Sequence, residues 1–279
     1  MTAALELSHV SKQYKNFQLN DITFSLPKGC IMGLIGDNGA GKTTTIKLIL
    51  DQVKKSTGTI RIDGLDSKNP HARDHIGVVL DECHFHEMLR PAMISTIMRG
   101  MCKNWDDDLF RSYLSRLSVP NKTVKEFSKG MKMKLSIAAA LAHHPKLLIL
   151  DEATAGLDPV VRNDILDIFY DFIQDEEHSI LMSTHITSDL EQVADYITFL
   201  HNGQLILSDT KDSIDERFAV LKCGALSDVD KSDIIRYRKN RFGHEILVSG
   251  NAKKKYRNLI SEQITLETLM LFYAKGESI

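Results

Sequence analysis

The feature that most constrains this chain is the octapeptide GDNGAGKT at residues 36–43. It has the spacing G-x-x-x-x-G-K-[ST] and stands between an apolar run typical of a strand, Cys30–Gly36, and a stretch typical of a helix, Thr43–Leu50. Glycines at these positions let backbone N–H groups close around phosphate oxygens, and the N-terminus of the following helix adds its dipole. The sequence therefore predicts that a phosphate group binds at this turn.

Individual side chains of this turn have separate predicted roles. Lys42 is expected to reach the terminal phosphates, and the hydroxyl of Thr43 is expected to ligate Mg²⁺. The residues that we expect to bind the phosphates are Gly36, Asp37, Asn38, Gly39, Ala40, Gly41, Lys42, Thr43 and Thr44.

A second constraint is an acidic pair, Asp151 and Glu152, that follows directly on the apolar run Leu147–Leu150. We interpret the run as a core strand, which places Asp151 at a C-terminal strand end, where ligands bind in parallel sheets. Asp151 is expected to hold Mg²⁺. Glu152 is the better candidate for a general base, since a carboxylate within hydrogen-bond reach of an attacking water can polarise it. Such a pair alone is often structural, but together with the phosphate loop it indicates chemistry on a bound phosphate.

Strands and helices alternate along most of the chain, which predicts an α/β fold with a parallel sheet covered on both faces. Antiparallel strands are expected at both ends of this region, because residues 5–26 alternate apolar and polar side chains and Asn202-Gly203 is typical of a hairpin. A helical insertion is expected at about residues 82–145. The composition changes after the hairpin, so we expect a nucleotide-binding domain at residues 1–212 and a small α/β appendage at 213–279.

Composition argues against several classes of protein. The 35 lysines and arginines against 37 aspartates and glutamates give a net charge of −2, which does not indicate a nucleic-acid partner. The four cysteines are scattered without a Cys-x-x-Cys pair, which argues against a disulfide scaffold and a cysteine zinc site. The opening MTAALELSHVSKQYK lacks the apolar core of a signal peptide, and no run reaches the roughly 18 apolar residues of a membrane span. If the protein works at a membrane, another chain is expected to hold it there.

The charge is unevenly distributed along the chain. Residues 231–279 carry ten lysines and arginines against five aspartates and glutamates. Lys253–Lys255 with Arg257 is ordinarily a solvated face, and the alternative is a surface that meets anionic lipid or an acidic partner.

Five motifs in a fixed order resemble those of the nucleotide-binding subunit of ATP-binding cassette (ABC) transporters, over Leu5 to about Asp209. Besides the phosphate loop and the acidic pair, they are FSKGM (Phe127–Met131), similar to the LSGGQ signature, AGLD (Ala155–Asp158), similar to the D-loop, and STH (Ser183–His185), similar to the switch-histidine segment. The resemblance implies the P-loop NTPase fold of ABC ATPases, with an antiparallel β-subdomain, a helical subdomain and the C-terminal appendage. It also implies ATP and Mg²⁺ as cofactors.

In that family two cassettes pair head to tail, and each ATP lies between the phosphate loop of one and the signature helix of the other. Carried over, Ser128 and Gly130 would contact the γ-phosphate of the ATP that the partner mainly holds. His185 matches the histidine that senses the γ-phosphate, and Tyr14 matches the aromatic residue that stacks on adenine. An isolated histidine or tyrosine is more often structural, so these two roles depend on the resemblance.

The chain departs from the family pattern at two places. Asp81 stands where the family has a glutamine that ligates Mg²⁺; a carboxylate can also ligate a hard cation, but it is shorter and adds negative charge. Lys129 and Met131 replace the second glycine and the glutamine of the signature. Lys129 either adds positive charge near phosphate or is a solvated side chain, and the sequence leaves both open.

The segment that follows has two interpretations. The sequence CHFH at residues 83–86 contains soft ligands that could suggest a transition-metal site. The same segment matches the family's contact with the membrane subunit, and we favour that interpretation, with a docking surface near Phe85, Met88 and Leu89.

The sequence thus predicts the ATP-binding and ATP-hydrolysing subunit of an ABC transporter, which couples ATP-driven dimer closure to movement of a substrate, in the direction of export, by a separate transmembrane permease subunit. The resemblance is strongest to the exporter-type multidrug and antibiotic-resistance group. We expect a homodimer that is cytoplasmic and peripheral on the inner face of the cell membrane, without a nucleic-acid partner. One alternative is a soluble ABC ATPase acting on nucleic acid or ribosomes, which usually has two cassettes or a long coiled coil. Another is a cassette that binds ATP without hydrolysis, against which Glu152 and His185 argue.

Overall fold

The computed structural model describes residues 3–241 and 243–278. The strands of its large sheet are β1 (Ala3–Gln13), β2 (Gln18–Pro27), β3 (Ile31–Ile35), β4 (Thr57–Ile62), β5 (Leu65–Asp66), β6 (Ile76–Val79), β7 (Leu147–Asp151), β8 (Ser179–Ser183), β9 (Tyr196–His201) and β10 (Gln204–Thr210). The strands of its small sheet are β11 (Phe218–Cys223), β12 (Ile234–Asn240), β13 (Gly243–Ser249) and β14 (Ile260–Gln263). The helices are α1 (Lys42–Ile49), α2 (Pro70–Arg73), α3 (Pro91–Met101), α4 (Asp107–Arg116), α5 (Lys129–Leu141), α6 (Pro159–Phe172), α7 (Thr187–Val193), α8 (Lys211–Arg217), α9 (Gly250–Lys253) and α10 (Leu266–Lys275).

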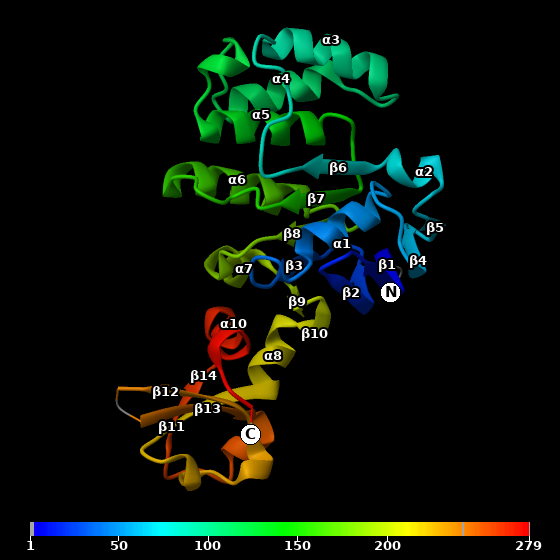
Figure 1. Cartoon of the computed structure of the whole chain (residues 1–279). Helices are drawn as coiled ribbons and strands as arrows, with labels where there is room; N and C mark the ends of the chain where they lie inside the picture. The colour runs from blue at the N-terminus through cyan, green and yellow to red at the C-terminus, as the bar shows by residue number, and fades with distance from the viewer. Residues whose placement is uncertain (1–2, 242, 279) are drawn as a thin grey trace.

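The parts follow one another along a long axis. Figure 1 shows α3, α4 and α5 at one end, the large sheet with its helices in the middle, and the small sheet at the other end. Over the described ranges, no helix has both the length and the apolar character needed to cross a membrane.

The large sheet contains ten strands in the order β5-β4-β1-β2-β10-β9-β3-β8-β7-β6. The neighbours from β9 through β3, β8 and β7 to β6 are parallel. Strands β1, β2, β4 and β5 pair antiparallel, as β10 does with β9. Strands β3, β7 and β8 are buried along their whole length, as strands covered on both faces must be. The predicted α/β fold is therefore confirmed, and the antiparallel strands from the beginning and the end of this region of the chain lie on the same side of the sheet.

The parallel register brings the C-terminal ends of four strands to one edge of the sheet. Ser183 of β8 is paired with Leu34 of β3 on one side and with Asp151 of β7 on the other. Val79 of β6 is paired with Leu150 of β7. Side chains that follow these four strand ends therefore come together although they are far apart in the sequence.

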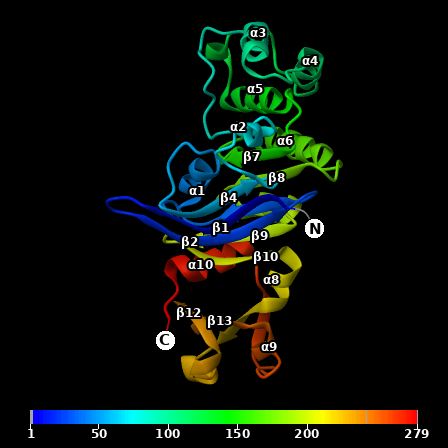
Figure 2. The same ribbon diagram turned by 90° about the vertical axis from the view of Figure 1, so that its right-hand side faces the viewer.

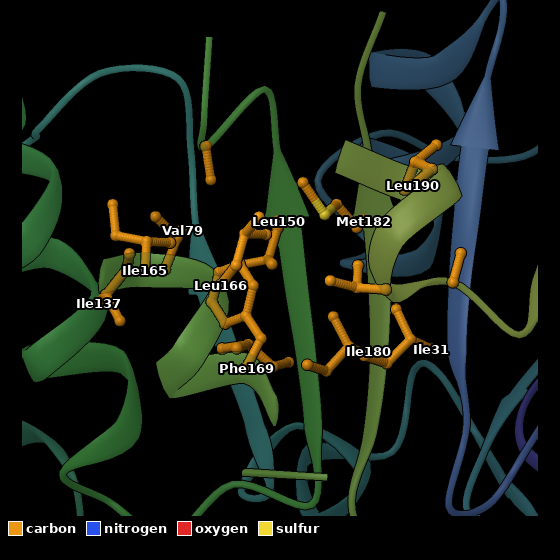
Figure 3. Packing of buried hydrophobic residues seen from close by; sticks show 14 of the residues in the cluster. Ile31, Val79, Ile137, Leu150, Ile165, Leu166, Phe169, Ile180, Met182 and Leu190 are labelled. Atoms are coloured by element: carbon orange, nitrogen blue, oxygen red, sulfur yellow. The ribbon is translucent and has the colours of Figure 1, made fainter. Parts of the chain in front are cut away.

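Helix α6 illustrates how the core covers this sheet. Asp158 caps the helix by accepting a hydrogen bond from the N–H of Val161 at 3.0 Å, and Pro159 occupies its first position. Its apolar face packs with Leu150 and Ile180 of the sheet (Figure 3). The residues at i, i+3, i+4 and i+7 on that face are all buried, namely Ile165, Ile168, Phe169 and Phe172. Each side chain of this size contributes roughly 1.5–3 kcal/mol when it is fully buried.

Helices α3, α4 and α5 form the region between β6 and β7 in which the sequence predicts a helical insertion. Asp106 caps α4 and accepts a hydrogen bond from the N–H of Leu109 at 2.9 Å. The indole N–H of Trp105 faces Ser95 of α3 at 3.1 Å and Asp107 of α4 at 3.0 Å. This polar contact ties the first two helices of the region together.

The small sheet is antiparallel, with strand order β12-β13-β11-β14. We call these strands, together with α9 and α10, the C-terminal unit. One face of the sheet packs on Val229 and Tyr256, and the other face joins the main core through Leu269 and Phe272 of α10. Figures 1 and 2 both show α10 between the small sheet and the large one. Helix α10 therefore belongs to the cores of both parts.

Candidate active site

The turn between β3 and α1 follows a path that requires glycine. Gly41, the N-cap of α1, has a φ of 113°, and a Cβ there would lie 2.7 Å from Cδ1 of Leu19. A Cβ on Gly36 would lie 2.3 Å from the carbonyl oxygen of Leu200. No acidic residue occupies the first turn of α1, so the positive potential of its N-terminus is not offset there. The turn is suited to an anion.

Lys42 is buried, and its ammonium group faces this turn. Nζ donates to the carbonyl oxygen of Gly36 at 2.7 Å and to that of Asp37 at 3.4 Å. It also lies 3.7 Å from Oε1 of Glu152. Neutral carbonyls are weaker partners for a cation than phosphate oxygens are. A bound phosphate can therefore replace them.

Asp151 is buried at the end of β7. Burial raises the pKa of its carboxyl group, and the nearby hydroxyls of Ser183 and Thr43 oppose this shift only in part. Its Oδ1 atom has no hydrogen-bond partner among the described residues. A buried carboxylate oxygen without a partner is costly unless a cation binds it. Asp151 and Thr43 therefore form an oxygen donor set that fits Mg²⁺.

Glu152 connects two side chains that the sequence assigns to the site. Its Oε2 accepts a hydrogen bond from Nδ1 of His185 at 2.7 Å, and its Oε1 is the atom near Lys42. The residue has a φ of 53°, a left-handed conformation that costs energy in a residue with a Cβ and is common at functional sites. Its N–H donates to the carbonyl oxygen of Ser183 at 2.8 Å. The structure thus brings the phosphate loop, the acidic pair and the switch histidine together.

A cavity of about 760 Å³ lies beside this cluster. Asn38, Glu152 and His185 line it, together with Asp81 from the segment after β6. Asp81 is exposed, and its charge is among the causes that raise the pKa of Asp151. An additional carboxylate therefore acts on the buried one.

The signature residues lie at the start of α5. Ser128 caps this helix and is exposed, whereas Gly130 is buried where a Cβ would lie 3.2 Å from Val161 of α6. Lys129 is exposed and lines the cavity, and its Nζ would lie 2.9 Å from a Cβ on Gly156 of the D-loop segment. Among the described residues that line the cavity, neither Ser128 nor Gly130 occurs. The structure therefore does not gather these two residues with the rest of the site in one chain.

Tyr14 lies in a turn after β1, and its side chain is 38% exposed. The ammonium of Lys12 is 5.1 Å from its ring centroid. The N–H of Tyr14 donates to the carbonyl of Phe17 at 2.8 Å, and the ring of Phe17 would lie 3.2 Å from a Cβ on Gly41. Phe17 is thus an aromatic side chain in contact with the phosphate loop that sequence analysis missed. Its only signal is an aromatic residue three places after Tyr14 in a polar turn.

The sequence CHFH does not form a metal cluster. In residues 3–241 and 243–278, no three His, Cys, Asp or Glu side chains group in a way that could hold a metal ion. Mg²⁺ in nucleotide sites needs no such group, because it usually takes one or two protein ligands together with phosphate oxygens and water.

Comparisons with known proteins agree with this geometry. The ABC transporter family matches residues 19–155. The lantibiotic transport ATP-binding protein SrtF of Streptococcus pyogenes is 34% identical over 224 residues, which cover 77% of this chain and 95% of SrtF. The ABC transporter ATP-binding protein YtrB of Bacillus subtilis is 31% identical over 229 residues, covering 81% and 78% of the two chains. The bacitracin transport ATP-binding protein BcrA of Enterococcus faecalis is 34% identical over 212 residues, covering 74% and 69%.

Solved structures give the same answer. The structure of an ATP-binding subunit of an ABC transporter has a TM-score of 0.69 and 29% identity, covering 76% of this chain and 91% of that one. Nothing in these comparisons supports the alternative of an ABC ATPase acting on nucleic acid or ribosomes. The chain belongs to the ABC transporter family: it is an ABC ATPase, the ATP-binding subunit of a transporter, in the group that includes lantibiotic and bacitracin transport ATP-binding proteins.

Proposed function

We propose that each chain binds ATP with Mg²⁺ at the edge of the parallel sheet and hydrolyses it with Glu152 as general base. The observation that carries this proposal is the position of the Glu152 carboxylate, 3.7 Å from the ammonium of Lys42 and 2.7 Å from Nδ1 of His185. A carboxylate that lies between Lys42 and His185 in this way is placed to accept a proton from a water molecule beside the γ-phosphate.

We propose that Asp151 and Thr43 hold the metal ion. The unpartnered buried oxygen of Asp151 supports this assignment. Asp81 is a third proposed ligand in place of the family's glutamine, because its charge already acts on Asp151. When bound, Mg²⁺ would neutralise phosphate charge and polarise the γ-phosphoryl group.

The protein's own side chains then act in a defined order in this proposal. Lys42 leaves the carbonyl oxygens of Gly36 and Asp37 and binds the terminal phosphates. His185 turns from Glu152 to the γ-phosphate. Oε2 of Glu152 then loses the hydrogen bond from the His185 ring and keeps the longer one from the His185 N–H at 3.4 Å, so it can accept a proton from water. The base is thus available only when ATP is present.

A head-to-tail homodimer completes the proposed site. Ser128 is exposed at the N-terminus of α5, which spans thirteen residues, and Gly130 follows within its first turn. The γ-phosphate of an ATP held by the phosphate loop of a second chain would bind there, at the positive end of the helix. The adenine would stack on Tyr14, which is exposed and is joined by a backbone hydrogen bond to Phe17, the residue whose ring contacts the phosphate loop.

A groove suited to a permease helix lies beside β6. It has a volume of about 600 Å³ and is lined by Phe85, Met98 and Met101 among other residues. Three side chains on one face of α3 extend this apolar surface, and they are 51%, 45% and 74% exposed: Met93, Ile97 and Met101. Leu89 packs against the hydrophobic core and does not line the groove, so we move the proposed docking surface from Leu89 to α3.

Membership in the family implies a transmembrane permease partner, and we propose that this groove recruits the chain to the cytoplasmic face of the cell membrane. Figure 1 shows α3 and the C-terminal unit at opposite ends of the molecule. If the chain docks at the membrane through α3, Lys253–Lys255 lie at the far end of the molecule. Anionic lipid is therefore a poor partner for these lysines. The relatives SrtF and BcrA are named for lantibiotic and bacitracin transport, which supports a compound of this class as the proposed substrate, and export is the direction that we propose.

The exchange Glu152→Gln tests the proposed base. ATP hydrolysis should fall about 10²–10⁴-fold, the usual contribution of a general base, while ATP binding persists. Glu87→Gln is the matched control, because Glu87 lines the same cavity but does not contact Lys42 or His185. Hydrolysis by Glu152→Gln within a few-fold of the unmodified protein would overturn the assignment.

A further inference from the structure

The phosphate loop is held from behind by the hairpin of β9 and β10. The N–H of Gly203, in the turn of this hairpin, donates to the carbonyl oxygen of Ala40 at 3.0 Å. The carbonyl of Leu200 also lies so close to Gly36 that a Cβ there would be 2.3 Å away. The path of the loop therefore depends on the position of the hairpin.

His201, the last residue of β9, extends this contact through its side chain. Its Nδ1 atom lies 3.4 Å from Oδ2 of Asp37 in the loop. The side-chain amide nitrogen of Asn202 lies 3.0 Å from Nε2 of the same ring. When the amide donates to Nε2, the ring proton is on Nδ1, where it faces the carboxylate. Nδ1 has no hydrogen bond in the described part of the chain, so a small movement of the loop toward the ring would complete one.

Tyr273 of α10 packs against the same histidine from the C-terminal unit. The two ring centroids are 6.1 Å apart at 62°, and Tyr273 also meets Phe199 edge-on at 5.2 Å. The guanidinium of Arg236 lies 4.5 Å from the centroid of the Tyr273 ring. These contacts restrict the positions that the His201 ring can take.

The start of α10 is attached to a second element of the site. The N–H of Leu266 donates to Oε1 of Glu191 at 3.1 Å, and Glu191 lies on α7. Helix α7 begins two residues after His185. Helix α10 thus contacts the strand β9, whose hairpin backs the phosphate loop, and helix α7, which follows the switch histidine.

We propose that His201 is a positioning residue for the phosphate loop and that Tyr273 holds it in place. The C-terminal unit then sets how well the loop fits the phosphates of ATP, although it supplies no group that touches them. This inference rests on the proposed binding of ATP at Gly36–Thr43.

The test is the steady-state kinetics of His201→Leu and Tyr273→Ala in the full chain. Each exchange should raise KM for ATP about three- to tenfold with little change in kcat, because the lost contact orients the loop and takes no part in the bond-breaking step. The two effects should not add in the double variant, since both act through one contact. Tyr273→Phe keeps the ring and should restore the KM of the unmodified protein.

A destabilised C-terminal unit provides the control. Tyr256 is buried in that unit, and its hydroxyl bonds to the N–H of Asp230 at 3.0 Å. Tyr256→Phe should lower thermal stability without changing KM. An unchanged KM in His201→Leu and Tyr273→Ala, or an equal rise in Tyr256→Phe, would overturn the inference. If the unmodified protein bound no ATP at all, or if Lys42→Ala bound it equally well, the proposed site would fail and the inference with it.

Discussion

The edge of the large sheet and the small C-terminal sheet use charged side chains in opposite ways. In the small sheet they pair with one another, Arg238 with Glu245 at 2.5 Å and Lys222 with Glu262 at 2.6 Å. At the edge of the large sheet, Asp151 keeps a buried oxygen without a partner within the described residues. The two carboxylates of the small sheet are therefore paired with cations of that sheet, whereas the buried carboxylate at the edge keeps an oxygen available for a ligand.

Strand direction accounts for much of this difference. Parallel strands end on the same side, so the polar residues after β3, β7 and β8 must share a small space. Antiparallel strands such as β12 and β13 place opposite charges side by side along the ladder, as Arg238 and Glu245 show. At the parallel edge, buried oxygens of Asp151 and Ser183 stay without partners among the described residues, and there they can serve chemistry.

The largest effect expected from this contrast is that of Lys42→Ala. The affinity for ATP should fall about 100-fold, since hydrogen bonds to charged groups contribute about 1.5–3 kcal/mol and Lys42 faces the phosphate site. Lys222→Ala in the small sheet is the matched control and should leave the affinity within about twofold, because Lys222 pairs with Glu262. Titration calorimetry with ATP measures both, and equal losses would remove the distinction between the two regions.

A smaller effect is expected from Asp81→Gln. If Asp81 adds charge at the metal, its loss should change the Mg²⁺ concentration for half-maximal hydrolysis by roughly three- to tenfold without abolishing ATP binding. Glu82→Gln is the control, because Glu82 is the next residue and lines the same cavity. Superimposable Mg²⁺ titrations of Asp81→Gln and the unmodified protein would show that Asp81 does not act on the metal.

The smallest effect concerns the stability of the C-terminal unit. The ammonium of Lys255, together with the hydroxyl of Tyr256, lowers the pKa of Asp233 below its ordinary value of 3.8. A carboxyl group with a lowered folded-state pKa stabilises the fold above its ordinary pKa, and this stability is lost as the pH falls through the folded value. Lys255→Met should therefore lower Tm by about 1–3 °C near pH 7 and leave it almost unchanged near pH 2, as expected for an exposed pair. A difference in Tm that persists at low pH would assign the effect to packing.

Much of the fold could be predicted because its signals are local. The hairpin at Asn202-Gly203 forms between β9 and β10, and the helix predicted directly after the phosphate loop is α1. In each case a few neighbouring residues determine the backbone, so one sequence is enough.

The site was predictable in part for a different reason. The spacing of Gly36–Thr43 and the acidic pair at a strand end carry their chemistry within short segments. The contacts of His201 with Asp37 and Tyr273 depend on how elements far apart in the sequence pack together, so no local sequence pattern predicts them. The roles of Tyr14, Ser128 and Gly130 remain predictions, because they require a nucleotide or a second chain.

The account's central claim is that each chain supplies the phosphate loop and base to one ATP and the start of α5 to another. Light scattering on Glu152→Gln tests it most directly, because this variant should bind ATP without consuming it. With saturating Mg²⁺ and ATP the account predicts a mass of twice 31.4 kDa, which returns to a lower value when ATP is removed or when Lys42→Ala is added to the same chain. A Glu152→Gln protein that binds ATP and stays monomeric would contradict the claim.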